Sequence, residues 1–123
     1  MKTHQDPRHL ARIKVMQELF SYQFSRENLP QLEITKKIIK NLKKIDKYIV
    51  SSAPTWPINK INRMDLAVLR LAVYELTLKK DVPTKVVIDE AVELAKEYGS
   101  EASASFINGA LGKLIIDHHI YTT

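Results

Sequence analysis

The sequence predicts an all-α fold in a single domain, residues 1–123, from three observations. Apolar residues recur at helical spacing along most of the chain, and prolines or short polar segments interrupt them at intervals. We find no pair of alternating segments around a tight turn, which a β-hairpin would require. A chain of 123 residues is long enough for one hydrophobic core and too short for two independent ones.

The first predicted helix begins at Pro7 and ends near Phe24, because the side chain of Asp6 can cap the first backbone N–H groups and proline is tolerated in the first turn. Its apolar stripe has spacings of four, four and three residues: Ala11, Val15, Leu19 and Tyr22. A second helix is predicted over 31–52. Its apolar stripe consists of Ile38, Leu42, Ile45 and Ile49, and its lysines take the opposite face.

The third predicted helix covers about 58–79, after the prolines Pro54 and Pro57 break the chain. Between Met64 and Leu78 it carries only three charged residues, so we place it in the middle of a bundle: Asp65, Arg70 and Glu75. Buried charges seldom lack partners, and we therefore expect Arg70 and Glu75 to be paired internally.

The fourth helix follows the break at 81–84 and stops at Gly99, for which we predict a left-handed conformation. The last helix starts near Ser100 or Ser103 and runs to about His118. Each of its two interior glycines costs about 1 kcal/mol relative to alanine. Close packing of another helix would offset this cost, on a groove of small residues formed by Ser105, Gly109 and Gly112.

Composition narrows the function classes. Hydrophobic residues make up 45% and charged residues 27%, a balance typical of globular proteins. The chain has no cysteine, no apolar run approaching the ~20 residues that span a bilayer, and no signal peptide at its start. We therefore expect a cytosolic protein with no membrane association. We also expect no metal, no cofactor and no enzymatic activity, because no base-and-orienter arrangement or glycine-rich phosphate loop is present.

The net charge of +5 is distributed unevenly. Residues 1–14 and 36–47 are basic, and residues 81–101 are acidic. A polyanion would be attracted to the first half of the chain and repelled by part of the second. The six lysines of 36–47 are either a solvated helix face or an electrostatic footprint for RNA.

Three stretches resemble the NusB family of bacterial transcription antitermination factors, in the order and spacing of that family. They are "RHLARIKVMQELFSYQF" at 8–24, "WPINKINRMDLAVLRLAVYEL" at 56–76 and "DVPTKVVIDEAVELAKEYGSEASASFINGALGKL" at 81–114. The resemblance implies two small helix bundles packed across each other. It also implies binding of boxA-like single-stranded RNA from ribosomal RNA leaders, together with the ribosomal small-subunit protein NusE, in an antitermination complex with RNA polymerase.

Carried onto this chain, the resemblance implies a set of RNA-binding candidates: Lys2, Arg8, Arg12, Lys14, Gln17, Lys85, Phe106 and Asn108. Arg8 and Arg12 lie near a helix start, where cations oppose the helix dipole, and phosphate binding would explain them. Alternatively, Arg12 lies along the core edge and pairs with a carboxylate. Phe106 either stacks on an unpaired base or belongs to the core. The candidates for contact with the protein partner are Asp65 and Arg70.

Two other functions remain open. The chain is also similar to the NusB-like module at the N-terminus of some ribosomal RNA cytosine methyltransferases, which would be inactive without a catalytic domain. The second alternative is a helical adaptor that binds only protein.

Overall fold

Helix α4 (Arg63–Tyr74) is the centre of the molecule, and every residue from Asp65 to Tyr74 is buried. The computed structural model describes residues 6–120. Around α4 lie α1 (Pro7–Tyr22), α2 (Glu33–Lys40), α3 (Leu42–Ser52), α5 (Thr84–Tyr98) and α6 (Ser103–Asp117). The described residues contain no strand, which confirms the all-α prediction.

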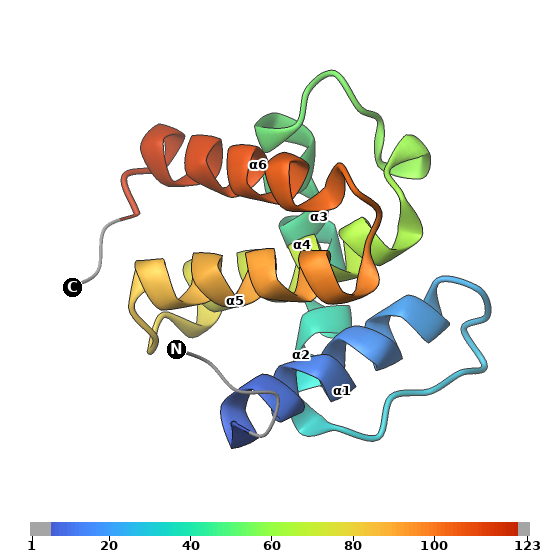
Figure 1. Cartoon of the computed structure of the whole chain (residues 1–123). Coiled ribbons are helices and arrows are strands. Elements are labelled where there is room, and N and C mark those ends of the chain that lie inside the picture. The colour runs from blue at the N-terminus through green and yellow to red at the C-terminus, as the bar shows by residue number, and fades with distance from the viewer. Residues whose placement is uncertain (1–5, 121–123) are drawn as a thin grey trace.

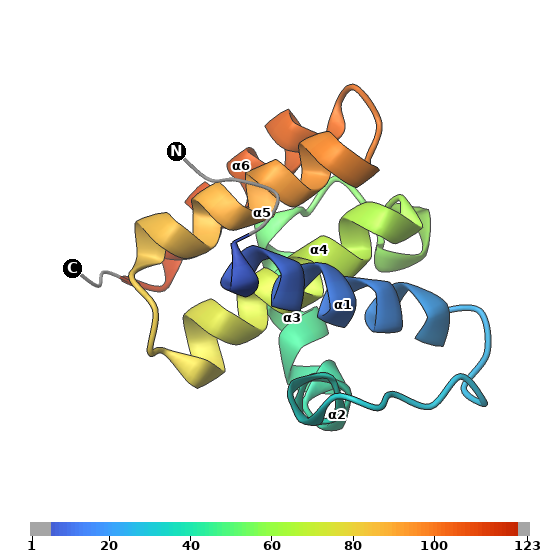
Figure 2. The ribbon, with the colours of Figure 1, turned by 60° about the horizontal axis from the view of Figure 1, so that its bottom comes forward.

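The helices divide into two groups that share α4. Helices α5 and α6 lie side by side, and α1 and α2 lie on the other side of the molecule (Figure 1). Seen from below, α4 runs between α5 and α2, while α1 crosses in front of it (Figure 2). Helix α3 contacts both α4 and α6 and so links the groups.

The start of α1 follows the sequence prediction. The Asp6 carboxylate accepts a hydrogen bond from the Arg8 backbone N–H at 2.8 Å, and Pro7 occupies the first turn. Val15 and Leu19 are buried as predicted, but Ala11 is exposed. The buried stripe is rotated relative to the prediction because His9 and Met16 face the neighbouring helices instead.

The predicted helix over 31–52 is wrong in one respect, because it is divided at Asn41 into α2 and α3. The side-chain amide of Asn41 donates to the Lys37 carbonyl at 2.8 Å, and ψ of Asn41 is 17°. A side chain that bonds the preceding turn competes with the regular backbone hydrogen bond and ends the helix there. Ile38, Ile45 and Ile49 are buried as expected.

The predicted helix over 58–79 is also shorter than expected. A 3₁₀ turn, η1 (Ile58–Lys60), comes first, and α4 begins only after Asn62, whose side chain accepts from the backbone N–H groups of Met64 and Asp65. At the other end the chain widens into a π-helical turn, η2 (Glu75–Lys79), which closes at Lys80 with φ 56°.

Two expectations about glycine are corrected. Gly99 ends α5 with φ −94° and ψ −167°, which is extended rather than left-handed. Glycine is required there because a Cβ would lie 2.4 Å from Ser103 Oγ and 2.7 Å from the Ala95 carbonyl oxygen. Gly109 and Gly112 do not support close packing, since a Cβ at either position would meet nothing within 4 Å. Their face of α6 is open.

Candidate nucleic-acid interface

Arg8 and Arg12 are one turn apart on α1 but have different surroundings. The Arg8 side chain is 85% exposed, and its Nε lies 3.6 Å from Asp6 Oδ1. The Arg12 side chain is only 11% exposed, and its Nε and Nη2 donate to the two carboxylate oxygens of Glu75 at 2.9 and 2.8 Å. The phosphate role predicted for Arg12 is therefore corrected. Its guanidinium is used inside the protein, whereas that of Arg8 projects into solvent.

His9, between the two arginines in sequence, forms a second internal link. Its side chain is 2% exposed; Nδ1 lies 2.7 Å from Glu90 Oε2, and Nε2 lies 2.9 Å from Glu97 Oε1. A carboxylate at each ring nitrogen favours the protonated form of His9, because an ionised carboxylate only accepts hydrogen bonds. Burial alone would lower the pKa of His9, but the hydrogen bonds and charges of Glu90 and Glu97 outweigh it and raise the pKa above 6.5.

These contacts join α1 to α5 through a cluster of five ionisable side chains. Arg12 Nη1 also lies 3.8 Å from Glu90 Oε1, so Glu90 is shared between His9 and Arg12. We call this set the ion cluster: His9, Arg12, Glu75, Glu90 and Glu97. It holds the first two turns of α1 in place and so determines where Arg8 emerges.

A cleft of about 1390 Å³ lies beside Arg8, between α1, α5 and the first half of α6. Asn108 lies at its α6 wall with Ala104 and Ser105. Carboxylates outnumber cations in the lining, since Asp6, Asp81, Asp89, Glu90 and Glu93 face only Arg8, Arg12 and Lys96. Phosphates would be repelled from the α5 wall, and the favourable positions for them are at the Arg8 rim.

Phe106 lines a second cavity, the aromatic pocket, with a volume of about 460 Å³. Its other lining residues are Trp56, Lys60, Ile61, Asn62, Asp65, Ala102 and Ser105. Phe106 is half-buried against the core, while the Trp56 side chain is 52% exposed. Phe106 therefore packs against the core and also lines the pocket, and stacking on an unpaired base stays a prediction.

Asp65 lies beneath the aromatic pocket and is 6% exposed. Burial raises the pKa of Asp65, and a hydrogen bond with the Ser103 side chain acts in the opposite direction. Its Oδ1 has no hydrogen-bond partner among the described residues. Asp65 is therefore covered by the pocket residues, rather than displayed on an open surface as its predicted partner role would require.

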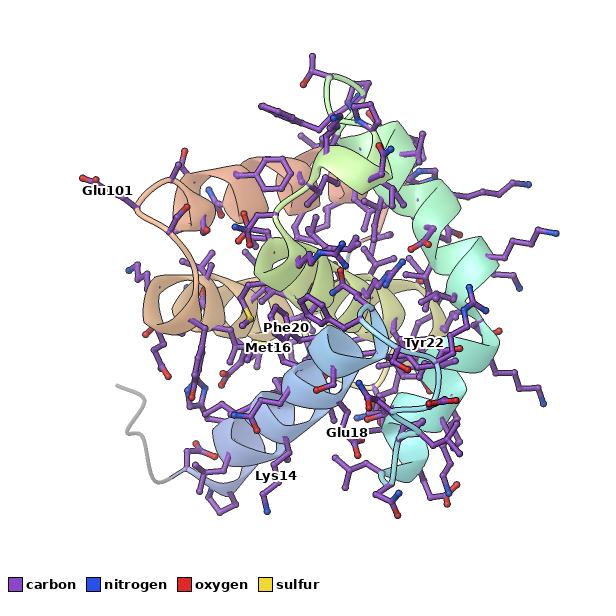
Figure 3. The ribbon with its side chains drawn as sticks, turned by 90° about the vertical axis from the view of Figure 1, so that its right-hand side faces the viewer. Lys14, Met16, Glu18, Phe20, Tyr22 and Glu101 are labelled. Carbon is purple, nitrogen blue, oxygen red and sulfur yellow. The ribbon has the colours of Figure 1, made fainter. Side chains whose placement is uncertain are left out.

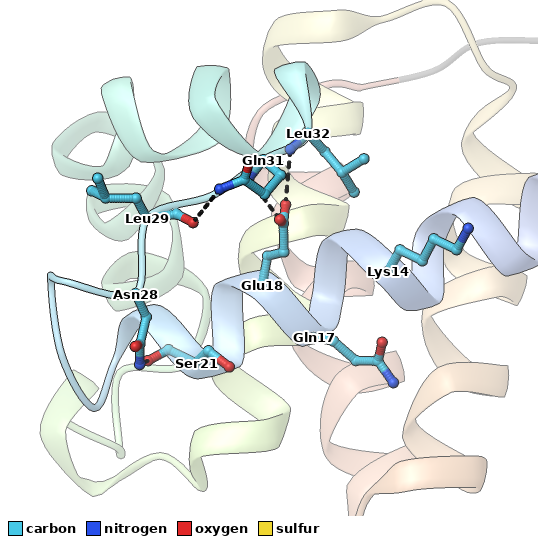
Figure 4. A pocket seen from close by; sticks show the side chains of 8 residues that line it. All are labelled: Lys14, Gln17, Glu18, Ser21, Asn28, Leu29, Gln31 and Leu32. Carbon is cyan, nitrogen blue, oxygen red and sulfur yellow. Dashed lines mark hydrogen bonds between the residues drawn. The ribbon is translucent and has the colours of Figure 1, made fainter.

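Lys14 and Gln17 lie on the outer side of α1, away from the Arg8 cleft. Lys14 points away from the body of the molecule, while Met16 points into it (Figure 3). The two residues line a groove of about 510 Å³, the α1 groove, with Leu29, Gln31 and Leu32 on the opposite wall (Figure 4). The structure therefore separates Lys14 and Gln17 from Arg8 and Asn108.

Glu18 holds the α1 groove together. Its carboxylate accepts from the backbone N–H groups of Gln31 at 2.7 Å and Leu32 at 3.2 Å, just before α2 begins (Figure 4). Burial acts to raise the pKa of Glu18, but these hydrogen bonds and the charge of Lys36 lower it overall. A side chain of α1 thus satisfies N–H groups at the start of α2, whose own cap residue Leu32 supplies no side-chain hydrogen bond.

Arg70 is buried, and its Nε and Nη2 donate to the two carboxylate oxygens of Asp46 at 3.0 and 2.9 Å. The internal pairing predicted for Arg70 and Glu75 is confirmed, each with a partner from another element. Arg70 lines a further groove of about 470 Å³, the Phe24 groove. Phe24 is 58% exposed there, and the Arg63 guanidinium lies 4.8 Å from its ring centroid.

Comparison with known proteins identifies the family. The family model described as the NusB family matches residues 30–115. The chain belongs to the NusB family. The transcription antitermination protein NusB of Acetivibrio thermocellus is 48% identical over 84 residues, which are 68% of this chain and 58% of that protein. The NusB of Clostridium botulinum strain Kyoto is 46% identical over 88 residues, which are 68% of this chain and 62% of that protein. The chain thus matches about three fifths of the length of these relatives.

Solved structures of NusB-type proteins have the same fold. T. maritima NusB is 37% identical, with a TM-score of 0.77 over 95% of this chain and 94% of that chain. A structure of the antitermination factors NusB and NusE in complex with dsRNA is 22% identical, with a TM-score of 0.74 over 89% of this chain and 96% of that chain. At that identity the similarity supports the fold alone.

The remaining candidates have simple placements. Lys85 is exposed as the second residue of α5, and its neighbour Val86 lines the Arg8 cleft. Lys2 lies outside the described residues 6–120. None of the helices in that range is long and apolar enough to cross a membrane. Within the same range, no group of three His, Asp or Glu side chains is arranged to hold a metal ion.

The sequence analysis did not single out Trp56 or the ion cluster as parts of the site. A tryptophan between two prolines indicates a rigid, exposed aromatic residue, and this signal could have identified Trp56. The acidic residues of α5 were recognised as a charge patch, but their pairing with His9 and Arg12 depends on tertiary contacts.

Proposed function

We propose that this NusB-family protein is a non-catalytic antitermination factor of the bacterial cytosol. It binds boxA-like single-stranded RNA together with a ribosomal protein of the NusE type, and the assembly acts on RNA polymerase. Its relatives in Acetivibrio thermocellus and Clostridium botulinum are transcription antitermination proteins, which supports this proposal. The structure of NusB and NusE in complex with dsRNA shows that a protein of this fold assembles with both kinds of partner.

The observation that carries the proposal is the connection between the Arg8 cleft and the aromatic pocket. Ser105 lines both cavities, so α6 offers a continuous path from the Arg8 rim past Asn108 to Phe106. An RNA strand on this path would place a phosphate at the exposed guanidinium of Arg8 and an unstacked base against Phe106 and Trp56. These two contacts, charge neutralisation and base stacking, are the usual means of binding single-stranded RNA.

The ion cluster acts indirectly in this proposal. It holds the helix that carries Arg8. It also pairs Arg12 with Glu90, a cation and a carboxylate that both line the Arg8 cleft. The RNA backbone would follow the Arg8 rim and α6 and avoid Asp89 and Glu93 on the α5 wall.

The NusE-type partner is proposed to dock in the Phe24 groove. Phe24 is an exposed aromatic ring held by an edge contact with Phe20 at 4.9 Å and by the Arg63 guanidinium. Aromatic and arginine side chains in a groove are typical of interface centres. Arg70, predicted to contact the partner, would support the groove from below through its pair with Asp46.

The experiment compares Phe106→Ala with Phe24→Ala, two aromatic truncations on separate surfaces. Fluorescence anisotropy measures binding of boxA-like and scrambled RNA, and a pull-down measures the NusE-type protein. We expect Phe106→Ala to weaken RNA binding by about 5- to 150-fold, the range for losing one stacked base, and to leave partner binding unchanged. Phe24→Ala should weaken only partner binding.

Equal affinity of the wild-type protein for boxA-like and scrambled RNA would contradict the proposed function. Partner binding without any RNA binding would instead identify the chain as a protein-only adaptor. An unchanged RNA affinity in Phe106→Ala would remove the aromatic pocket from the interface.

A further inference from the structure

The outer sides of α2 and α3 carry a regular array of lysines. The segment "KKIIKNL" at 36–42 is followed by "KKIDKYI" at 43–49, so lysines recur at the same three positions of two seven-residue blocks. The buried residues of these blocks, Ile38, Ile45 and Ile49, face the core, and the lysines face solvent. We define the lysine ridge as Lys36, Lys37, Lys40, Lys43, Lys44 and Lys47, all of them exposed.

Little negative charge competes for these lysines. Asp46, on the same helix as Lys43 and Lys44, is taken by the guanidinium of Arg70. Glu33 pairs with Lys36 at 3.2 Å between exposed side chains, a contact that contributes little. Over residues 6–120, the other five ridge lysines make no ion pair.

The lysine ridge continues toward α1. The positive charge of Lys36 lowers the pKa of Glu18, a residue that lines the α1 groove together with Lys14 and Gln17. The Glu18 carboxylate accepts from the N–H groups of Gln31 and Leu32, so the hydrogen bonds of this carboxylate are made within the protein. The acidic helix α5 lies on the opposite side of the molecule from α2 (Figure 2).

We propose that the lysine ridge binds the phosphate backbone of RNA flanking the boxA-like element, without reading its sequence. This inference rests on the proposed function, which supplies the RNA. The ridge lysines are distributed over two consecutive helices of 8 and 11 residues, so the ridge is long enough to contact several phosphates of one strand. A membrane surface fits less well, because most apolar residues of α2 and α3 face the core and Val50 is the one large apolar side chain exposed on these two helices.

The test uses two RNAs, the boxA-like element alone and the same element with an eight-nucleotide flank of scrambled sequence. Dissociation constants are measured from low to high KCl for the wild-type protein and two triple variants. Lys37→Gln, Lys40→Gln, Lys44→Gln removes ridge charge. The control variant, Lys79→Gln, Lys80→Gln, Lys113→Gln, removes the same charge elsewhere, from exposed positions.

We expect the flank to tighten wild-type binding and to steepen its salt dependence. In the ridge variant the flank should confer no gain, and the slope of log K against log salt should fall by about two, since each phosphate contact on a single strand contributes about 0.7. Binding of the element alone should be unchanged in the ridge variant. The control variant should retain the gain from the flank.

Each other outcome overturns a separate statement. No gain from the flank with wild-type protein, or an equal loss in both triple variants, overturns the inference about the ridge. Failure of the element alone to bind overturns the proposed function, and the flanked RNA then still reports on the ridge. Ridge-dependent binding to vesicles containing phosphatidylserine, without any gain from the RNA flank, would identify an anionic lipid surface as the partner instead.

Discussion

Arginine and glycine occur both in the packed region where α1 and α6 meet α5 and on the outer surface of the molecule. Their surroundings differ between these two regions. In the first region, Arg12 is enclosed and paired with Glu75, and Gly99 lies against Ser103. On the outer surface, Arg8 and the lysine ridge project into solvent, and Gly109 and Gly112 have open space around them. An enclosed group contributes to the fold because its neighbours depend on it. An exposed one is available to a partner.

The largest expected effect separates the two arginines. Arg12→Ala leaves Glu75, itself 4% exposed, as a buried carboxylate without its guanidinium partner. Breaking a buried ion pair by removing one member costs about 3–5 kcal/mol. Arg8→Ala removes an exposed group and should change the free energy of unfolding by less than about 0.5 kcal/mol. Urea denaturation of both variants measures the difference.

Equal free energies of unfolding for the two variants would show that the Arg12–Glu75 pair does not stabilise the folded protein. Arg8→Ala should, in contrast, weaken RNA binding while its unfolding curve overlies that of the wild-type protein.

A smaller effect separates two glycines. Gly99→Ala places a methyl group against Ser103 and the Ala95 carbonyl oxygen, and such overpacking costs about 1–3 kcal/mol. Gly109→Ala adds a methyl group in open space on a helix and should raise the free energy of unfolding by about 1 kcal/mol. Relative to the wild-type protein, the denaturant midpoint should fall for Gly99→Ala and rise for Gly109→Ala. A destabilised Gly109→Ala would mean that the open face of α6 is covered in the folded protein.

The smallest effect is a pH dependence that belongs to His9. Among residues 6–120, the groups that the contacts place at its ring include Glu90 and Glu97 on α5, with Arg12 on α1 and Glu75 beyond them. Because the pKa of His9 is raised above 6.5 in the folded protein, its stabilising contribution is complete below pH 6.5 and is lost as pH rises through the raised pKa.

The free energy of unfolding is measured between pH 6 and 9 for the wild-type protein and for His9→Gln, which retains hydrogen bonding without titrating. The wild-type value should fall with pH, and the variant should show a flatter profile. Parallel profiles would contradict an imidazolium at position 9.

Sequence periodicity predicted the helices well where local signals are strong. The cap at Asp6, the start of α5 after Pro83 and the start of α6 at Ser103 agree with the structure. The break at Asn41 was missed because one asparagine with its side chain on the preceding turn does not alter the apolar pattern. The open glycine face of α6 was missed because small residues indicate close packing only when another helix is present to pack there.

The roles assigned to the site residues stay predictions, and the structure shows which of these side chains are exposed. Exposure of Arg8 and the half-buried state of Phe106 agree with roles in RNA binding, whereas Arg12, Asp65 and Arg70 are held inside. An arginine looks the same in sequence whether a carboxylate lies within reach or not. Glu75 is 63 residues from Arg12 along the chain, and only the packing of α1 on α4 brings them together.

By itself, the sequence determined the helical character of the chain, its family and the separation of its basic and acidic segments, because these follow from residue types and their local spacing. Tertiary structure decided which charges are free. Burial converts Arg12, His9 and Arg70 into internal partners, since an unpaired charge away from water is too costly to remain. Arg8 and the lysine ridge, in contrast, are exposed and within reach of a phosphate backbone.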